Sequence, residues 1–202
     1  MYLHRILSLA AVLTIGAPKL ALAQCPVLTT NSPADELTAF LRSSKELPAE
    51  RQDRDCIQFA LEQLGSKHSL DAIPVLVDYL DFERPLTEAE REGFSFHGSR
   101  KYIGGTYIAS SSLFTFGKVA VPALVSAIKT RESPLIRRNA TYTIMQVFRA
   151  EPFKGIELLE QEALASPPPV AANLRAAVLF ALKWCDERNR RRCEAATHAE
   201  TR

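Results

Sequence analysis

The sequence predicts an all-α protein in which about three to four helical hairpins stack as an α-solenoid between capping terminal helices. The stretch AIPVLVDYL at 72–80 returns as AVPALVSAI at 120–128, with Pro third in both copies. The apolar positions of both copies are spaced i, i+3, i+4, i+7, which is one face of an amphipathic helix and not the alternation of a strand. One pair of such helices cannot bury its own apolar surface, so repeated pairs are expected to stack.

Each copy is expected to be the second helix of a helix–turn–helix unit. Pro74 and Pro122 fall in the first turn, where a missing N–H costs nothing and the fixed φ suits helix entry. We expect the preceding helices to end at Gly65 and Gly117. The buried faces of these four helices are predicted to be Ile57, Ala60, Leu61, Leu64; Ile73, Leu76, Val77, Leu80; Ala109, Ser112, Leu113, Phe116; and Val121, Leu124, Val125, Ile128.

Later segments extend the series. Residues 133–148 predict a helix with Ser133 as N-cap and Pro134 in its first turn, and 151–165 predicts its partner helix, with Gly155 inside it. After the break SPPPV, residues 172–185 predict a further helix whose buried stripe includes Leu182 and Cys185. At the other end Ser32 is expected to cap a helix within 32–42. These terminal helices would cover the open ends of the stack.

The first 23 residues are typical of a secretory signal peptide. Arg5 precedes an apolar run from Ile6 to Ala17, and the small-residue pattern ALA stands just before Gln24. The run is shorter than the roughly 20 residues of a membrane span, although an uncleaved anchor is the alternative. Gln24 before Cys25 argues against a lipoprotein. We therefore expect an exported chain, periplasmic or secreted, cleaved after Ala23, with no transmembrane segment in the mature protein.

The mature chain is predicted to be electrically neutral. Residues 1–23 contain two basic side chains, Arg5 and Lys19, and no acidic one. The 25 basic residues of the whole chain therefore fall to 23 in the mature protein, against 23 acidic residues. Binding to nucleic acid depends largely on neutralising phosphates, so this balance gives no support for a nucleic-acid partner.

Four cysteines follow the predicted cleavage site. An even number in an exported chain indicates two disulfides, for which three pairings exist. We favour Cys25–Cys56 and Cys185–Cys193, because each would tie a terminal segment beside the repeats. The alternative is four reduced cysteines, with Cys56 and Cys185 filling apolar helix faces.

With these patterns in place, the chain resembles HEAT-repeat proteins. AIPVLVDYL and AVPALVSAI resemble second helices of HEAT repeats, and LIRRNATYTI and NLRAAVLFAL resemble first helices. The 48-residue spacing of the copies exceeds the usual repeat of about 40, which leaves open whether the first two units stack directly. The expected organisation is a signal peptide (1–23), an N-terminal capping segment with one helix (24–52), the repeat domain (53–185, with an insertion at 81–107) and a charged tail (186–202).

The resemblance implies a curved protein-binding scaffold whose second helices line the concave side. Their polar positions are then the candidate partner contacts, namely Asp78, Tyr79, Ser126 and Lys129. An ordinary solvated helix face is the alternative interpretation of each of these residues.

The insertion at 81–107 is the second candidate surface. It is longer than the usual connection between packed helices, and we expect a short helix in PLTEAEREGF followed by a surface loop. Long loops on rigid scaffolds often bind partners, and aromatic side chains are frequent anchors of interfaces. The candidate contacts are Phe94, Phe96, His97 and Tyr102. The alternative is that Phe94 and Phe96 only pin the loop over the groove between repeats.

The predicted function is a non-catalytic, exported HEAT-repeat scaffold that binds another protein, without a cofactor, metal or catalytic residues. The sequence has no HExxH motif, no GxSxG motif and no phosphate-binding loop. One alternative is a HEAT-like enzyme of the lyase or hydrolase class. Another is a binder of an anionic cell-envelope polymer, since the tail carries Arg188, Arg190, Arg191 and Arg192, although acidic residues offset them nearby.

Overall fold

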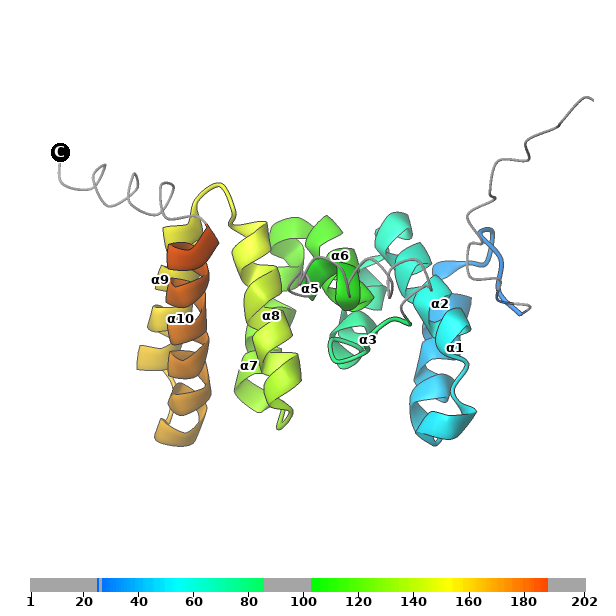
Figure 1. Ribbon diagram of the computed structural model, residues 1–202, viewed down its shortest axis with the longest axis horizontal. Coiled ribbons are helices and arrows are strands. Elements are labelled where there is room, and N and C mark those ends of the chain that lie inside the picture. Colours follow the sequence, from blue (N-terminus) through cyan, green and yellow to red (C-terminus); the bar gives the residue numbers. More distant parts are fainter. Residues whose placement is uncertain (1–24, 26, 86–102, 189–202) are drawn as a thin grey trace, which may run out of the picture.

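The computed structural model of the chain describes residue 25 and residues 27–85 and 103–188 (Figure 1). This part of the chain is helical and contains no strand, which confirms the all-α prediction. Its α-helices are α1 Ala34–Glu46, α2 Arg54–Lys67, α3 Ile73–Asp78, α5 Ile103–Thr106, α6 Ile108–Thr115, α7 Val121–Thr130, α8 Pro134–Val147, α9 Pro152–Leu164 and α10 Pro168–Arg188. Three 3-10 turns accompany them: η1 Ala49–Arg51, η2 Leu70–Ala72 and η3 Gly117–Ala120.

The helices follow one another along the long axis of the molecule in chain order, from α1 and α2 to α9 and α10 (Figure 1). One layer is formed by α2, α6, α8 and α10, each in contact with the next. A second layer begins with α1, α3 and α7, which also contact one another in turn. Contacts between α1 and α2, α3 and α6, α7 and α8, and α9 and α10 join the layers, and the apolar core lies between them.

The tightest pairs differ from the hairpins expected from the sequence. The sequence pairs α6 with α7 inside one unit, but α7 packs most extensively against α8. The reason is the turn at η3, where the chain bends by 119° between Ile108–Thr115 and Gly117–Thr130. Two helices related by that angle diverge. The apolar face of α7 is therefore buried mainly against α8, the next helix along the chain.

The two copies of the repeated pattern occupy equivalent positions in the fold. α3 begins at Ile73 and α7 at Val121, so each has its proline in the first turn, as predicted. The four apolar side chains of each copy are all buried, and the predicted faces of α2 and α6 are buried as well. The helical period in the sequence thus located the core correctly in all four helices.

The two glycines expected to end helices behave differently. Gly117 follows Phe116, the C-cap of α6, and has a φ of +59°, the left-handed conformation of a helix stop. Gly65 does not end α2, which continues to Lys67 and stops at His68, whose φ is 52°. A Cβ at Gly65 would lie 2.7 Å from the Ser112 Oγ atom of α6. Gly65 therefore allows the close approach of two helices.

α2 and α6 pack directly on each other although the insertion separates them in sequence. The Ser112 hydroxyl donates to the Leu61 carbonyl at 2.8 Å, and the Thr115 hydroxyl donates to the Gly65 carbonyl at 2.9 Å. Both donors come from α6 and both acceptors from α2. The first two predicted units are consequently neighbours in space.

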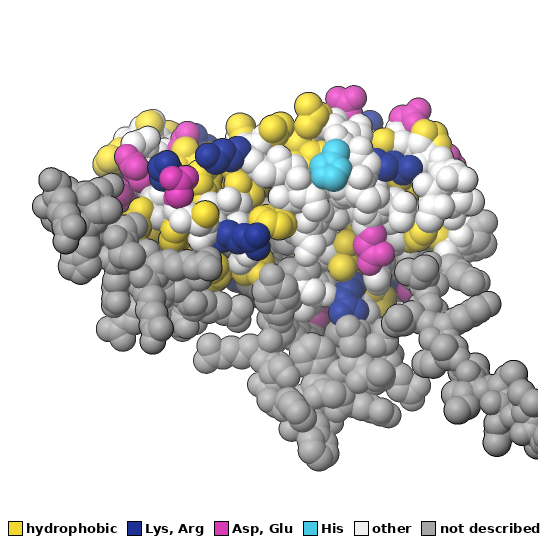
Figure 2. Space-filling view, turned by 90° about the horizontal axis from the view of Figure 1, so that it is seen from above, with side chains coloured by type: hydrophobic (Ala, Val, Ile, Leu, Met, Phe, Trp, Pro, Cys, Tyr) yellow, Lys and Arg dark blue, Asp and Glu magenta, His cyan; other side chains and the backbone are white. Residues whose placement is uncertain are grey.

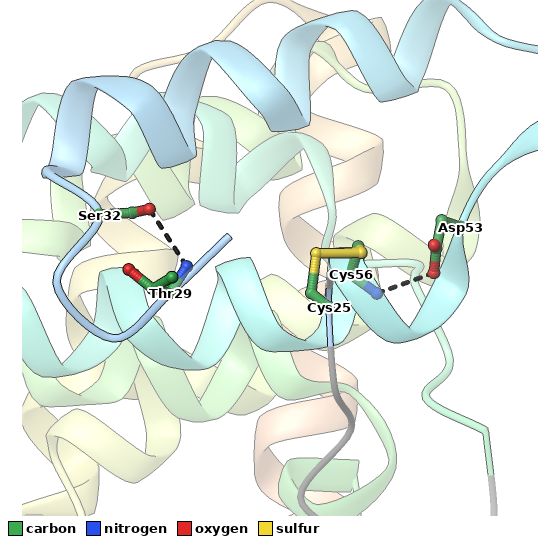
Figure 3. Close-up of a disulfide and its surroundings, with 5 residues drawn as sticks. All are labelled: Cys25, Thr29, Ser32, Asp53 and Cys56. Atoms are coloured by element: carbon green, nitrogen blue, oxygen red, sulfur yellow. Dashed lines mark hydrogen bonds between the residues drawn. A yellow bond between two sulfur atoms is a disulfide. The ribbon is translucent and has the colours of Figure 1, made fainter. Parts of the chain in front are cut away.

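The predicted disulfide Cys25–Cys56 is present (Figure 3), with 4.6 Å between the two Cα atoms. It fastens the segment before α1 to the first turn of α2, and a disulfide indicates an oxidising, exported environment. Asp53 caps that turn by accepting from the Cys56 N–H at 3.0 Å. The expected cap of α1 is wrong, because the Ser32 hydroxyl oxygen accepts instead from the Thr29 N–H at 3.2 Å.

The last helix differs from its prediction at both ends. α10 begins at Pro168 because prolines fit the first turn of a helix, and it runs past Cys185 to Arg188. Leu182, expected on the buried stripe, is 40% exposed, while Trp184 is buried in its place. Cys185 is buried as expected, but Cys193 lies outside the described residues, so the pair Cys185–Cys193 stays a prediction.

Candidate functional site

The chain leaves α3 through residues 78–84, which we call the exit segment because they lead into the insertion. Basic and amide side chains from four other elements hold it. Lys45 of α1 donates to the Asp78 carbonyl at 2.7 Å, and Arg54 of α2 donates to the Glu83 carbonyl. The other two contacts are an ion pair of Arg131, which follows α7, with the Asp78 carboxylate, and a 2.6 Å hydrogen bond from Asn139 of α8 to the Leu80 carbonyl.

The Asn139 contact is the most buried of these. Asn139 is fully buried on the face that α8 turns inward, and its Oδ1 atom accepts from Arg138 at 3.2 Å. A buried amide without partners would destabilise the fold, so both ends of this side chain are satisfied. The Asn139 side chain therefore fixes the position of the exit segment relative to α8.

Tyr79 is the second residue of the exit segment. Its hydroxyl donates to the Leu41 carbonyl at 2.7 Å, and the Lys45 ammonium lies 4.9 Å from the centroid of its ring. Burial, followed by the carboxylates of Asp78 and Asp81, raises the pKa of Tyr79 to about 12. The phenol is therefore protonated at neutral pH, where it joins α1 to α3 as a hydrogen-bond donor and cannot act as a general base.

The far end of the insertion returns to the exit segment. The Arg84 N–H donates to the Thr106 carbonyl at 2.9 Å, and the Arg84 guanidinium donates to the Gly105 carbonyl. Residues 103–106, expected to lie in a loop, form the short helix α5. The chain thus leaves and re-enters the helical layers at one point, which explains how α2 and α6 can be neighbours.

An open cavity of about 340 Å³ lies beside the exit segment, and its lining is predominantly polar. Lys45, which also lies 3.6 Å from the Asp81 carboxylate, and Arg54, which stacks 4.9 Å from the Phe82 ring centroid, are both held by neighbours. The cavity presents donors and acceptors together, a combination that suits a polypeptide backbone. Its lining residues are Lys45, Gln52, Arg54, Tyr79, Asp81, Phe82 and Glu83.

The candidate contacts on the second helices have different environments. Tyr79 is only 2% exposed, so the expectation that it faces a partner is wrong: its ring packs in the core and its hydroxyl is used internally. Asp78 and Lys129 are half-buried and paired with Arg131 and Glu162. Ser126 is exposed on α7, as expected. The insertion candidates Phe94, Phe96, His97 and Tyr102 lie outside the described residues.

The basic residues that hold the exit segment were missed by sequence reasoning. Lys45, Arg54 and Arg131 look like ordinary surface residues, because the pairing partner of each is distant in sequence. Of the residues that hold the exit segment, Asn139 is the one whose role could have been recognised in the sequence. It lies beside Ile136 and Ala140 on an apolar helical face, where a polar residue requires a buried partner.

Neither a metal-binding cluster nor a single membrane-spanning helix occurs in the described ranges, residues 25, 27–85 and 103–188. Within them, no three His, Cys, Asp or Glu side chains are grouped so that they could hold a metal ion. No single helix there has the length and hydropathy of a membrane span, and the bent pair Ile108–Thr115 and Gly117–Thr130 reaches them only when taken together.

The chain was also compared with known proteins. Neither protein-family models, nor curated proteins, nor solved structures gave a match.

Proposed function

We propose that this chain is an exported, non-catalytic scaffold of HEAT-like helical hairpins that binds another protein. The support for a solenoid is the pair of layers in chain order, in which successive helices contact one another. No helix pair can bury its apolar face alone, and a neighbouring helix covers it. The support for export is the Cys25–Cys56 disulfide together with the signal-like residues 1–23, for which we propose cleavage after Ala23.

The observation that carries the binding proposal is the exit segment. Side chains from α1, α2 and α8 and from the end of α7 hold its backbone and its Asp78 carboxylate, and Arg84 joins it to the returning chain. Exposed ion pairs contribute little each, about 0–1 kcal/mol, but the buried Asn139 and Tyr79 hydrogen bonds add to them. A simple connection between two helices does not need this many side-chain contacts to hold its backbone.

A rigid frame at the base of a long aromatic segment is the arrangement by which scaffolds present binding loops. Phe94, Phe96 and Tyr102 then supply the large apolar contacts typical of interface anchors. The polar cavity beside the exit segment supplies hydrogen-bonding groups where the chain enters the insertion. The partner is accordingly a protein that contributes an apolar surface and exposed peptide groups.

The test is recovery of partners from native extracts by mature protein carrying an affinity tag, read by quantitative mass spectrometry. One variant replaces Phe94, Phe96 and Tyr102 with Ala. The matched control makes Ser95→Ala and Ser99→Ala in the same segment. Circular dichroism and thermal unfolding establish that both variants keep the helical fold.

We expect the aromatic variant to lose at least one partner that the serine variant retains. A second variant replaces residues 86–102 with a short Gly–Ser linker while keeping the Arg84–Thr106 hydrogen bond, and it should lose the same partner. Equal recovery by wild type and both variants would refute a binding role for the insertion.

A further inference from the structure

A second, mostly apolar cavity of about 210 Å³ lies between α8 and α10, which are side by side in the layer nearest the viewer in Figure 1. We call it the α8–α10 groove. α8 contributes Arg137, Arg138 and Thr141, and α10 contributes Ala176, Ala177 and Phe180. These positions form one helical stripe on each helix, so the cavity is the furrow between two neighbouring helices.

The groove exists because small side chains meet where the two helices face each other. Ala176, Ala177 and Thr141 leave space that larger residues would fill. Its volume is below the roughly 300–1,000 Å³ of small-molecule sites, so it suits one or two inserted side chains.

The charged side chains that line the groove are basic, Arg137 and Arg138, and no acidic residue lines it. α8, and α10 as far as Cys185, carry four cationic side chains and no acidic residue; acids return only at Asp186 and Glu187 in the last turn. The neighbouring helix α9 has more acidic than basic side chains. By contrast, the face of the molecule seen in Figure 2 mixes basic, acidic and apolar side chains. The four cations are Arg137, Arg138, Arg175 and Lys183, of which the two arginines of α8 line the groove.

Neutral groups hold the two arginines that line the groove. The Arg137 guanidinium donates to the carbonyls of Arg131 and Glu132, both at 2.7 Å. The Arg138 guanidinium donates to Asn139 Oδ1 and lies 5.7 Å from the centroid of the Tyr107 ring. These contacts orient the positive charges without neutralising them, which favours an anionic partner beside them.

We propose that the α8–α10 groove docks a partner polypeptide segment in which a bulky apolar side chain is flanked by acidic residues. The apolar residue enters between Thr141 and Ala176, and the flanking carboxylates meet Arg137 and Arg138. The proposal rests on the scaffold function above and adds the chemistry of the partner. A polymer with negative charge alone would leave the apolar floor unused.

The test measures binding of fluorescein-labelled peptides to the mature protein by anisotropy. The first peptide has a central Trp–Leu pair between Asp and Glu residues. The second replaces the acids with Lys, and the third replaces Trp–Leu with Ser–Ser. We expect the first peptide to bind at least about tenfold more tightly than either of the others, a difference on the scale of one interface anchor.

Two pairs of variants locate the binding. Ala176→Trp fills the groove and should weaken binding of the first peptide about tenfold, whereas Ala172→Trp, at an exposed position of α10 outside the lining, should not. Arg138→Glu should weaken binding similarly, whereas Arg42→Glu on exposed α1 surface makes the same charge change without effect. Ala176→Leu serves if the tryptophan variant unfolds.

Three results would overturn the proposal. They are no preference for the first peptide over the lysine peptide, equal binding of the serine peptide, and unchanged binding to folded Ala176→Trp and Ala176→Leu. Equal binding of the serine peptide would indicate a general anion site, as for an anionic envelope polymer. The linker variant lacking residues 86–102 should bind the first peptide normally, so failure of the groove and failure of the insertion are distinguishable.

Discussion

Substitution of Gly65 by Ala tests whether α2 and α6 are direct neighbours. The new Cβ would lie 2.7 Å from Ser112 Oγ and 2.9 Å from Ser112 Cα, which is backbone and cannot rotate away. Overpacking of this kind costs about 1–3 kcal/mol. Loss of the Ser112 hydrogen bond to Leu61 costs about 1 kcal/mol more, and the better helix propensity of Ala returns about 1 kcal/mol.

The expected net destabilisation is about 2 kcal/mol, which lowers Tm by about 4–8 °C in a chain of this length. Urea unfolding followed by circular dichroism at 222 nm measures it. Gly155→Ala in α9 is the matched control, because its Cβ would meet only side-chain atoms, Met145 Sδ at 3.2 Å and Phe148 Cβ at 3.3 Å. These side chains can adjust, so we expect a change within about 1 kcal/mol.

An unchanged or raised free energy of unfolding for Gly65→Ala would refute the close contact of α2 with α6. A cost at Gly155 equal to that at Gly65 would show that the effect is not specific to this contact. The cost at Gly65 should also be smaller in a Ser112→Gly background, where Oγ and Cβ are gone.

Three further predictions concern the disulfide and the exit segment. Cys56→Ser should lower the free energy of unfolding by about 3–4 kcal/mol, as expected for a cross-link spanning 31 residues. Because the Cys25–Cys56 bond is already absent in this variant, a reducing agent should have little further effect on how its Cys25 segment is held. Because the pKa of Tyr79 is raised from 10.0 to about 12, its stabilising effect is complete below pH 10 and is lost as pH rises through 12; urea unfolding across pH 9–12 should show that loss in wild type and not in Tyr79→Phe. Asn139→Asp replaces the donor to the Leu80 carbonyl with a buried carboxylate, so it should destabilise by about 3 kcal/mol or more at pH 7 and less at pH 4, with Asn139→Ala less affected by pH.

Much of the helical framework was predictable from local pattern. The spacing of Leu61 and Leu64, or of Leu124 and Ile128, identifies a buried face because a helix repeats every 3.6 residues. Prolines in first turns and Ser133 as an N-cap are equally local, and Ser133 does accept from the Ile136 N–H at 3.3 Å. These predictions held because each depends on residues within one or two turns.

The wrong predictions involved partners distant in sequence. Gly65 was expected to end a helix, but Ser112, which comes from beyond the insertion, decides its role. Tyr79 was expected on a surface, but its side chain is buried and its hydroxyl donates a hydrogen bond to the Leu41 carbonyl. Leu182 was expected inside, although the rotation of α10 against its neighbours turns Trp184 inward instead.

By itself, the sequence determined that the chain is helical and which faces of α2, α3, α6 and α7 are buried, because helical period and first-turn chemistry are properties of short segments. Only the tertiary structure decided that α7 packs on α8, that the insertion closes at Arg84 and Thr106, and that arginines of α8 meet alanines of α10 in a groove. Those features arise from the angle at a turn and from the packing of helices far apart in the chain, which no local pattern encodes.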